Sequence, residues 1–163
     1  MPNAYIGLGS NLGDPIRQLT DALTDLQALP GTSLVAQSSF YRSKALGPDD
    51  QPDYINAAAM LMTSLSGDAL MQYLLGIEQQ HGRVRGSERW QPRILDLDLL
   101  LYGQNQITTA GLVVPHPEIA KRNFVLMPLA EITPDLNIPG QGRVADLLAK
   151  IGMADIEKID RTW

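Results

Sequence analysis

The stretch RVRGSERWQPRILDLDLLLYG, residues 83–103, joins a basic segment to a strongly alternating one. The basic half holds four of the thirteen cationic residues of the chain: Arg83, Arg85, Arg89 and Arg93. In the second half, leucines alternate with Asp96 and Asp98. Side chains on a strand project to opposite faces in turn, so the two carboxylates share one face, roughly 6.6 Å apart along the chain. The alternation therefore predicts a strand over 94–101 with leucines on one side and acids on the other.

Two like charges on one strand face repel each other unless a cation lies between them. Carboxylate oxygens suit Mg²⁺, which in such sites also takes oxygens from a substrate phosphate. The adjacent guanidinium groups are suited to hold that phosphate. Acids on an edge strand can instead serve only to discourage aggregation. The combination of Asp-x-Asp with four arginines and a Trp-x-Pro-Arg run favours a site for metal and phosphate.

Length and composition indicate one globular domain spanning residues 1–163, with 44% apolar residues. The net charge of −5 argues against a general binder of nucleic acid or of anionic membranes. The chain has no cysteine, which excludes disulfides and thiolate chemistry. It has no apolar run long enough for a membrane span and no secretion signal at its start. We therefore expect a cytoplasmic monomer whose partners are small molecules.

Periodicity and turn signals predict the order strand, helix, strand, strand, helix, strand over the first hundred residues. The ranges are 4–8, 16–29, 33–42, 54–63, 70–77 and 94–101. Asp14 and Ser66 are expected to cap the two helices. This βαββαβ order predicts an α+β, ferredoxin-like antiparallel sheet with helices on one face. The other face is left for a ligand or for the remaining residues, which form a C-terminal extension.

The extension is expected to hold short helices interrupted at Pro128 and a last edge strand over 156–159. Near the start of the chain, Gly7, Gly9 and Gly13 are interpreted as turn and close-packing glycines. Their spacing fits neither a P-loop nor a dinucleotide fingerprint. Glu78 falls in the last turns of the second helix, where a solvated residue and a ligand contact are both open interpretations.

Four segments carry a resemblance, and the stretch quoted first belongs to one of them. In order, they are AYIGLGSNLGD, SSFYRS with LGPDDQPDYINA, the central GRVRGSERWQPRILDLDLLLYG, and VPHPEIAKRNFVLMPLAEI. Together they resemble the 6-hydroxymethyl-7,8-dihydropterin pyrophosphokinases of folate biosynthesis along essentially the whole chain. The resemblance implies transfer of the β,γ-diphosphate of ATP to the pterin hydroxymethyl group. It also implies two Mg²⁺ ions, AMP as the other product, and a ferredoxin-like fold.

The resemblance also implies roles for individual residues. Those implied for catalysis are Arg83, Arg93, Asp96 and Asp98, the two aspartates also holding the metal. Those implied for ATP are Glu78, Arg83, Arg85, Trp90, Arg93, Leu99, His116 and Arg122. Those implied for the pterin are Ser43, Leu46, Tyr54, Asn56, Trp90 and Phe124.

The residue chemistry agrees with a pterin pocket. A flat heterocycle favours aromatic neighbours such as Tyr54 and Phe124, and its amide edge favours the donors and acceptors of Asn56. Core packing is the alternative for Phe124, and capping of a backbone carbonyl is the alternative for His116. The chain departs from the family pattern at Ser43-Lys44-Ala45 and at Gln91, which affects the expected loop paths rather than the chemistry.

Three other functions fit parts of the pattern. A nucleotidyltransferase can share this topology and use paired aspartates with two metals, but no template-handling insertions are present. An RNA-recognition module has the same strand order, but the chain lacks its aromatic run and basic surface. A small-molecule regulatory module without turnover remains as the third alternative.

Overall fold

The computed structural model describes residues 2–11, 13–43, 53–81 and 95–159 of the 163-residue chain. Its first half contains the expected succession of elements. They are β1 (Asn3–Ser10), α1 (Pro15–Gln27), β2 (Thr32–Gln37), β3 (Tyr41–Ser43), β4 (Tyr54–Thr63), α2 (Gly67–Gln80) and β5 (Asp96–Tyr102). Asp14 accepts a hydrogen bond from the Arg17 amide, and Ser66 from the Ala69 amide. Both predicted helix caps are thereby confirmed.

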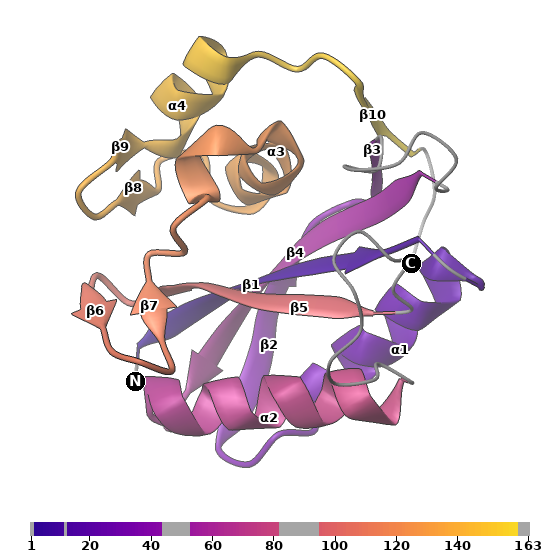
Figure 1. Ribbon diagram of the computed structural model, residues 1–163, viewed down its shortest axis with the longest axis vertical. Coiled ribbons are helices and arrows are strands. Elements are labelled where there is room, and N and C mark those ends of the chain that lie inside the picture. The colour runs from indigo at the N-terminus through magenta and orange to yellow at the C-terminus, as the bar shows by residue number, and fades with distance from the viewer. Residues whose placement is uncertain (1, 12, 44–52, 82–94, 160–163) are drawn as a thin grey trace.

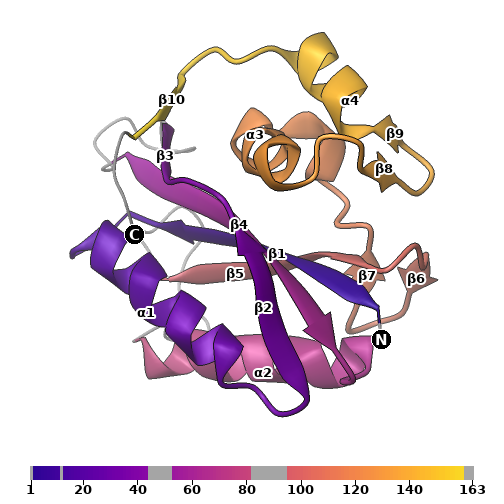
Figure 2. The same cartoon turned by 180° about the vertical axis from the view of Figure 1, so that it is seen from behind.

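The main sheet is antiparallel and has the order β10-β3-β4-β1-β5, with β2 also paired to β4. β1 thus lies between β4 and β5, two strands that are far apart in sequence (Figure 1). Helices α1 and α2 cover one face of the sheet (Figure 2). The ferredoxin-like α+β arrangement predicted from the sequence is confirmed.

The sequence predicted one strand over 33–42, but the structure has two, β2 and β3. Between them, the Ser38 amide donates to the Ala58 carbonyl at 2.9 Å, and the Ser38 hydroxyl accepts from the Ala58 amide at 2.9 Å. A side chain thus takes the place of a backbone carbonyl in the ladder, which breaks the regular strand.

The C-terminal extension covers the second face of the sheet. It consists of β6 (Ile107–Thr108), β7 (Val113–Val114), a 3-10 turn (Ile119–Lys121), α3 (Asn123–Ile132), β8 (Asn137–Ile138), β9 (Gly142–Arg143), α4 (Val144–Ile151) and β10 (Ile156–Lys158). The predicted interruption at Pro128 is wrong, because α3 runs through that residue. The prolyl nitrogen cannot donate, yet Leu126 and Leu129 on either side are fully buried and hold the helix on the sheet.

Two cores result, one on each side of the sheet. The core under α1 and α2 includes Leu70, Leu74 and Leu97, whereas the core under α3 includes Tyr5, Ala58 and Leu100. β10 then pairs with β3 as the expected edge strand. Tyr73 lies within the helix predicted over 70–77, and it is 41% exposed. The buried stripe of α2 follows Leu70 and Leu74 at four-residue spacing and leaves Tyr73 to one side.

Candidate active site

Asp96 and Asp98 lie on the face of β5 that the sequence predicted. Both residues are partly exposed, whereas Leu95, Leu97 and Leu99 are buried in the core under α1 and α2. The carboxylates therefore open on the opposite face of the sheet, beyond the part covered by α3. Among the described residues, no group of three or more His, Asp or Glu side chains is arranged to hold a metal ion.

Two rows of residues cross the sheet at this site. In the first row, Gly9 of β1 pairs with Asn56 of β4 on one side and with Asp96 of β5 on the other. In the second row, Gly7 lies between Ala58 and Asp98. Residues directly opposite one another in a sheet project to the same face. Adjacent strands are about 4.8 Å apart, so Asn56 and Asp96 stand on backbones about 10 Å apart.

Asn56 is held by a buried hydrogen bond. Its Nδ2 donates to the Ser43 hydroxyl at 2.6 Å, and both residues are only 5% exposed. With Nδ2 engaged by β3, the Oδ1 atom lies toward β1, 3.4 Å from where a Cβ on Gly9 would stand. Tyr54 lies two residues before Asn56 on the same strand face and is partly exposed. The structure thus places Ser43, Tyr54 and Asn56 beside one another.

His116 approaches the aspartates from the outer edge of β5. Its amide donates to the Leu100 carbonyl at 2.9 Å, and its Nε2 lies 3.9 Å from Asp98 Oδ1. Burial lowers the pKa of His116, and the positive charge of Arg122 lowers it further, against opposing effects of Glu118 and Asp96. The Nδ1 atom accepts a hydrogen bond from the Glu118 amide at 3.1 Å. The neutral ring therefore carries its proton on Nε2 and can donate it on the aspartate side.

Arg122 and Phe124 flank the start of α3. The Arg122 guanidinium carbon stands 5.7 Å from the centre of the Phe124 ring, a cation–π contact. Phe124 is only partly buried and belongs to neither core. Core packing, the alternative interpretation of Phe124, is therefore not what the structure shows. Its ring and the Arg122 charge remain available at the surface of α3.

Glu78 is not a solvated helix residue. It is 2% exposed and accepts a hydrogen bond from the Leu97 amide at 2.7 Å. Glu78 continues the buried stripe Leu70–Leu74 of α2, so it reaches β5 from the face opposite the two aspartates. Leu97 is the residue between Asp96 and Asp98. The Glu78 carboxylate thus holds the backbone of β5 between the two aspartates, from the side of the sheet that α2 covers.

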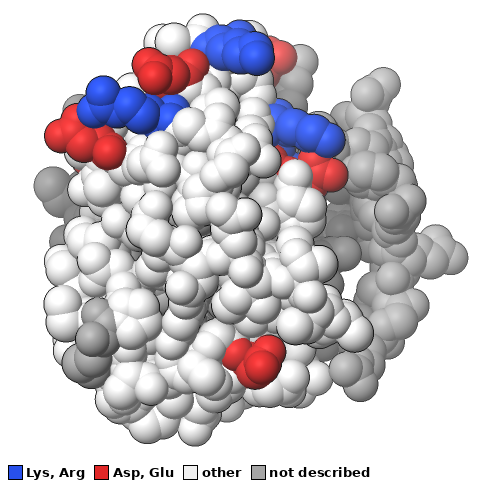
Figure 3. All heavy atoms as spheres, turned by 90° about the vertical axis from the view of Figure 1, so that its left-hand side faces the viewer, with Lys and Arg blue, Asp and Glu red and all other residues white. Residues whose placement is uncertain are grey.

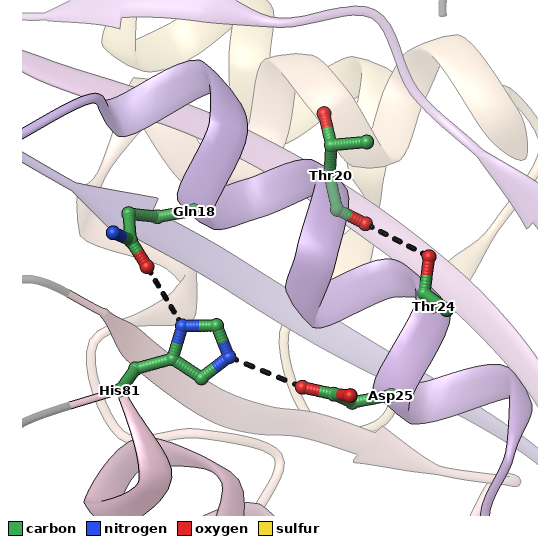
Figure 4. A network of polar contacts seen from close by, with 5 residues as sticks. All are labelled: Gln18, Thr20, Thr24, Asp25 and His81. Carbon is green, nitrogen blue, oxygen red and sulfur yellow. Dashed lines mark hydrogen bonds and ion pairs between the residues drawn. The ribbon is translucent and has the colours of Figure 1, made fainter.

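The last turn of α2 is also tied to α1. Figure 4 shows His81 between two side chains of α1, with Nδ1 2.7 Å from Gln18 Oε1 and Nε2 3.1 Å from Asp25 Oδ2. The ring thus joins the last turn of α2 to two side chains of α1. His81 is the helix C-cap, and the arginine segment follows it in sequence.

Several expected site residues lie outside the described residues: Leu46, Arg83, Arg85, Trp90 and Arg93. Leu99 is described, and its side chain is buried in the core on the far face of β5. Only its backbone is left for contact with a nucleotide. The sequence did not single out Gly9 as a site residue, although the strand pairing would have placed it between Asn56 and Asp96.

Comparisons with known proteins agree with this geometry. A sequence model described as 7,8-dihydro-6-hydroxymethylpterin-pyrophosphokinase (HPPK) matches residues 5–134. The 2-amino-4-hydroxy-6-hydroxymethyldihydropteridine pyrophosphokinase of Haemophilus influenzae is 49% identical over 148 residues, covering 91% of this chain and 92% of that protein. The protein of the same name from Pseudomonas aeruginosa is 44% identical and covers 95% of each chain.

Among solved structures, a crystal structure of Plasmodium falciparum HPPK-DHPS with pteroate matches with a TM-score of 0.74 and 12% identity. The match covers 97% of this chain and 46% of that protein, so this chain spans about half its length. At that identity the likeness concerns the fold.

Proposed function

Because this chain belongs to the 7,8-dihydro-6-hydroxymethylpterin-pyrophosphokinase family, we propose that it transfers diphosphate from ATP to 6-hydroxymethyl-7,8-dihydropterin. The products are AMP and the pterin diphosphate, and the enzyme acts in folate biosynthesis. The observation that carries this assignment is the extent of the likeness, which includes 49% identity over nearly the full length of a pyrophosphokinase. The geometry of the described residues supports separate positions for the two substrates.

The pterin is assigned to the β4 side of the site. The Asn56 amide and the Tyr54 ring present one hydrogen-bonding group and one aromatic face there, as a flat heterocycle requires. Phe124 is proposed as the second aromatic contact. Ser43 acts on the pterin by fixing the Asn56 amide through their 2.6 Å hydrogen bond. The sequence adds Leu46 and Trp90 to this pocket.

The triphosphate is assigned to the β5 side. Asp96 and Asp98 provide the carboxylate oxygens that Mg²⁺ prefers, and they leave the remaining positions for water and phosphate. The donor set thus fits Mg²⁺, and we propose two ions, held by these aspartates. When bound, Mg²⁺ neutralises charge on the phosphate oxygens.

Cationic and neutral donors surround that position. The Nε2–H group of His116 and the guanidinium N–H groups of Arg122 donate hydrogen bonds to phosphate oxygens. The family resemblance assigns Arg83, Arg85 and Arg93 to phosphate binding as well. It assigns Trp90 to contact with the nucleotide, and Leu99 is proposed to contact the nucleotide through its backbone. Glu78 is assigned to support of β5 in place of direct contact with ATP. Catalysis then depends on positioning and on charge compensation, with direct attack by the pterin hydroxyl.

We further propose that residues 1–163 form a single pyrophosphokinase domain that acts as a cytoplasmic monomer, where ATP is available. Residues after 134 belong to the same unit because β10 pairs with β3, which carries Ser43. Basic and acidic side chains lie beside one another on the surface in Figure 3, and no basic stripe is seen on that face among the described residues. The net charge of −5 supports small-molecule partners over nucleic acid. No described helix has the length and apolar character needed to cross a membrane.

The test is product analysis of a mixture of the protein, ATP, Mg²⁺ and the pterin. AMP together with a diphosphorylated pterin is the expected result. Free diphosphate with an adenylylated pterin would indicate a nucleotidyltransferase instead. Binding of both compounds without turnover would indicate a regulatory module, and either outcome would refute the proposed transfer. The Asp98→Ala variant, prepared in parallel, controls for contaminating activity.

A further inference from the structure

The backbone conformation at Gly9 does not require glycine. It lies inside β1, is paired on both sides, and does not have a positive φ. Glycine within a strand weakens it, because more backbone freedom is lost and no side chain packs. Such a glycine therefore usually marks a place where another group comes close to the backbone.

No described residue would clash with a side chain at position 9. A Cβ on Gly9 would stand 3.4 Å from Asn56 Oδ1 and 3.6 Å from the Tyr54 ring, both ordinary contact distances. A Cβ on Gly7 would stand 3.3 Å from the side chain of Leu100, which belongs to the core under α3. The neighbour of Gly7 is thus an apolar core residue, whereas the nearest side chains to Gly9 are those assigned to the pterin. Position 9 lies on the face shared by Asn56 and Asp96.

The proposed reaction explains what uses the space. The pterin lies at Asn56 on β4, and the phosphates lie at Asp96 on β5. Gly9 is the residue of β1 directly between the two. Reacting atoms must approach to about 3–3.5 Å before transfer. The hydroxymethyl oxygen and the β-phosphorus therefore have to meet above the intervening strand.

We infer that Gly9 forms the floor of the reaction centre, beneath the pterin hydroxymethyl group and the phosphorus that it attacks. This inference rests on the proposed function. In the transfer, the hydroxymethyl oxygen forms a bond to the β-phosphorus, and the bond from that phosphorus to the α,β-bridging oxygen breaks. AMP leaves with the bridging oxygen, and the hydroxyl proton passes to water. A side chain at position 9 would lift the hydroxymethyl group and lengthen the approach to phosphorus.

The test compares Gly9→Ala with wild type by calorimetry, using two ligands that differ only in the reacting group. The ligands are 6-hydroxymethyl-7,8-dihydropterin and 7,8-dihydropterin, each added with a non-hydrolysable MgATP analogue. Gly76→Ala is the matched control, because a Cβ at Gly76 in α2 has no neighbour within 4 Å. In Gly9→Ala, affinity for the hydroxymethyl ligand should fall by about tenfold or more, the scale on which sites discriminate one extra carbon. Affinity for 7,8-dihydropterin should fall less, because the added methyl contacts Asn56 and Tyr54 but has no hydroxymethyl group to displace. Affinity for the ATP analogue should be unchanged, and kcat should fall.

Equal losses for both pterins would overturn the inference, since the added methyl would then act on the ring or on the fold. Unchanged affinity and kcat in Gly9→Ala would overturn it as well. Wild-type protein provides a second measurement that does not depend on the variant folding. In its complex with the hydroxymethyl ligand, the ligand methylene protons should show nuclear Overhauser effects to the Gly9 Hα protons, and their absence would refute the placement. Failure of the proposed function itself would appear separately, as wild-type protein that forms no pterin diphosphate.

Discussion

Replacing Glu78 by alanine should destabilise the strand that carries the two aspartates. The Glu78 carboxylate is 2% exposed and accepts the Leu97 amide hydrogen at 2.7 Å. Among the described strands, β5 pairs only with β1, so this amide on its outer edge bonds to the Glu78 side chain and not to a strand. Alanine removes the acceptor and leaves the donor buried beside Asp96 and Asp98.

The size of the effect follows from that contact. A buried amide left without its acceptor costs about 1–3 kcal/mol. For a chain of this size, about 2 kcal/mol lowers the melting temperature by roughly 4–8 °C. Glu78→Gln keeps an oxygen acceptor at the same place and should lose less than half as much. Gln79→Ala removes an exposed side chain from the same turn and should change the melting temperature little.

The assay combines thermal unfolding with two local measurements. Amide hydrogen exchange should show faster opening of Leu97 in the alanine variant, because its hydrogen bond is gone. A titration with Mg²⁺ in the presence of an ATP analogue should show weaker apparent binding in Glu78→Ala and substantial recovery in Glu78→Gln. Equal melting temperatures and equal Leu97 exchange in the two variants would refute the supporting role of this carboxylate.

Three further outcomes are expected. Asp98→Ala should abolish turnover and Mg²⁺-dependent binding of ATP while stability holds or rises slightly, because repulsion from Asp96 is relieved; a melting temperature that drops by several degrees in metal-free protein would contradict this. Hydrogen bonds from Ser39 and Tyr41 stabilise the Glu131 carboxylate and lower its pKa from the ordinary 4.5, in spite of the opposing effect of burial. A group of this kind stabilises the fold above its unfolded pKa, so the stability advantage of wild type over Glu131→Gln should be full near neutral pH and shrink as the pH falls below 4.5; denaturant titrations across that range check it. His81→Phe removes both hydrogen bonds to α1 and should cost about 1–2 kcal/mol in the same assay, and a neutral result would mean that the contacts to Gln18 and Asp25 add no net stability.

Local patterns were sufficient to predict much of this fold. Leucine alternation gave the exposed face of β5, and helix caps at Asp14 and Ser66 gave the starts of α1 and α2. The break between β2 and β3 could not be predicted, because it depends on the Ser38 hydroxyl meeting an amide twenty residues away. No periodicity in the sequence contains that contact.

Some residues of the candidate site could likewise be predicted from the sequence, and others could not. Asp96, Asp98 and Asn56 were identified from their own chemistry and from a family resemblance. The position of Glu78 depends on which edge of β5 faces α2, and the role inferred for Gly9 depends on the pairing of β1 with two distant strands. Both are properties of tertiary pairing, which a pattern of residue types along one segment does not report.

The register of β5 against β1 joins folding to function at this site. Side chains alternate along a strand, so a shift of one residue would turn Asp96 and Asp98 into the core under α1 and α2 and expose three leucines. Burying two uncompensated carboxylates is far more costly than burying leucine side chains. The pattern of Leu95, Leu97 and Leu99, each at most 3% exposed, thus does two things at once. It supplies a core for the helices, and it excludes every register in which the aspartates would leave the face that they share with Asn56.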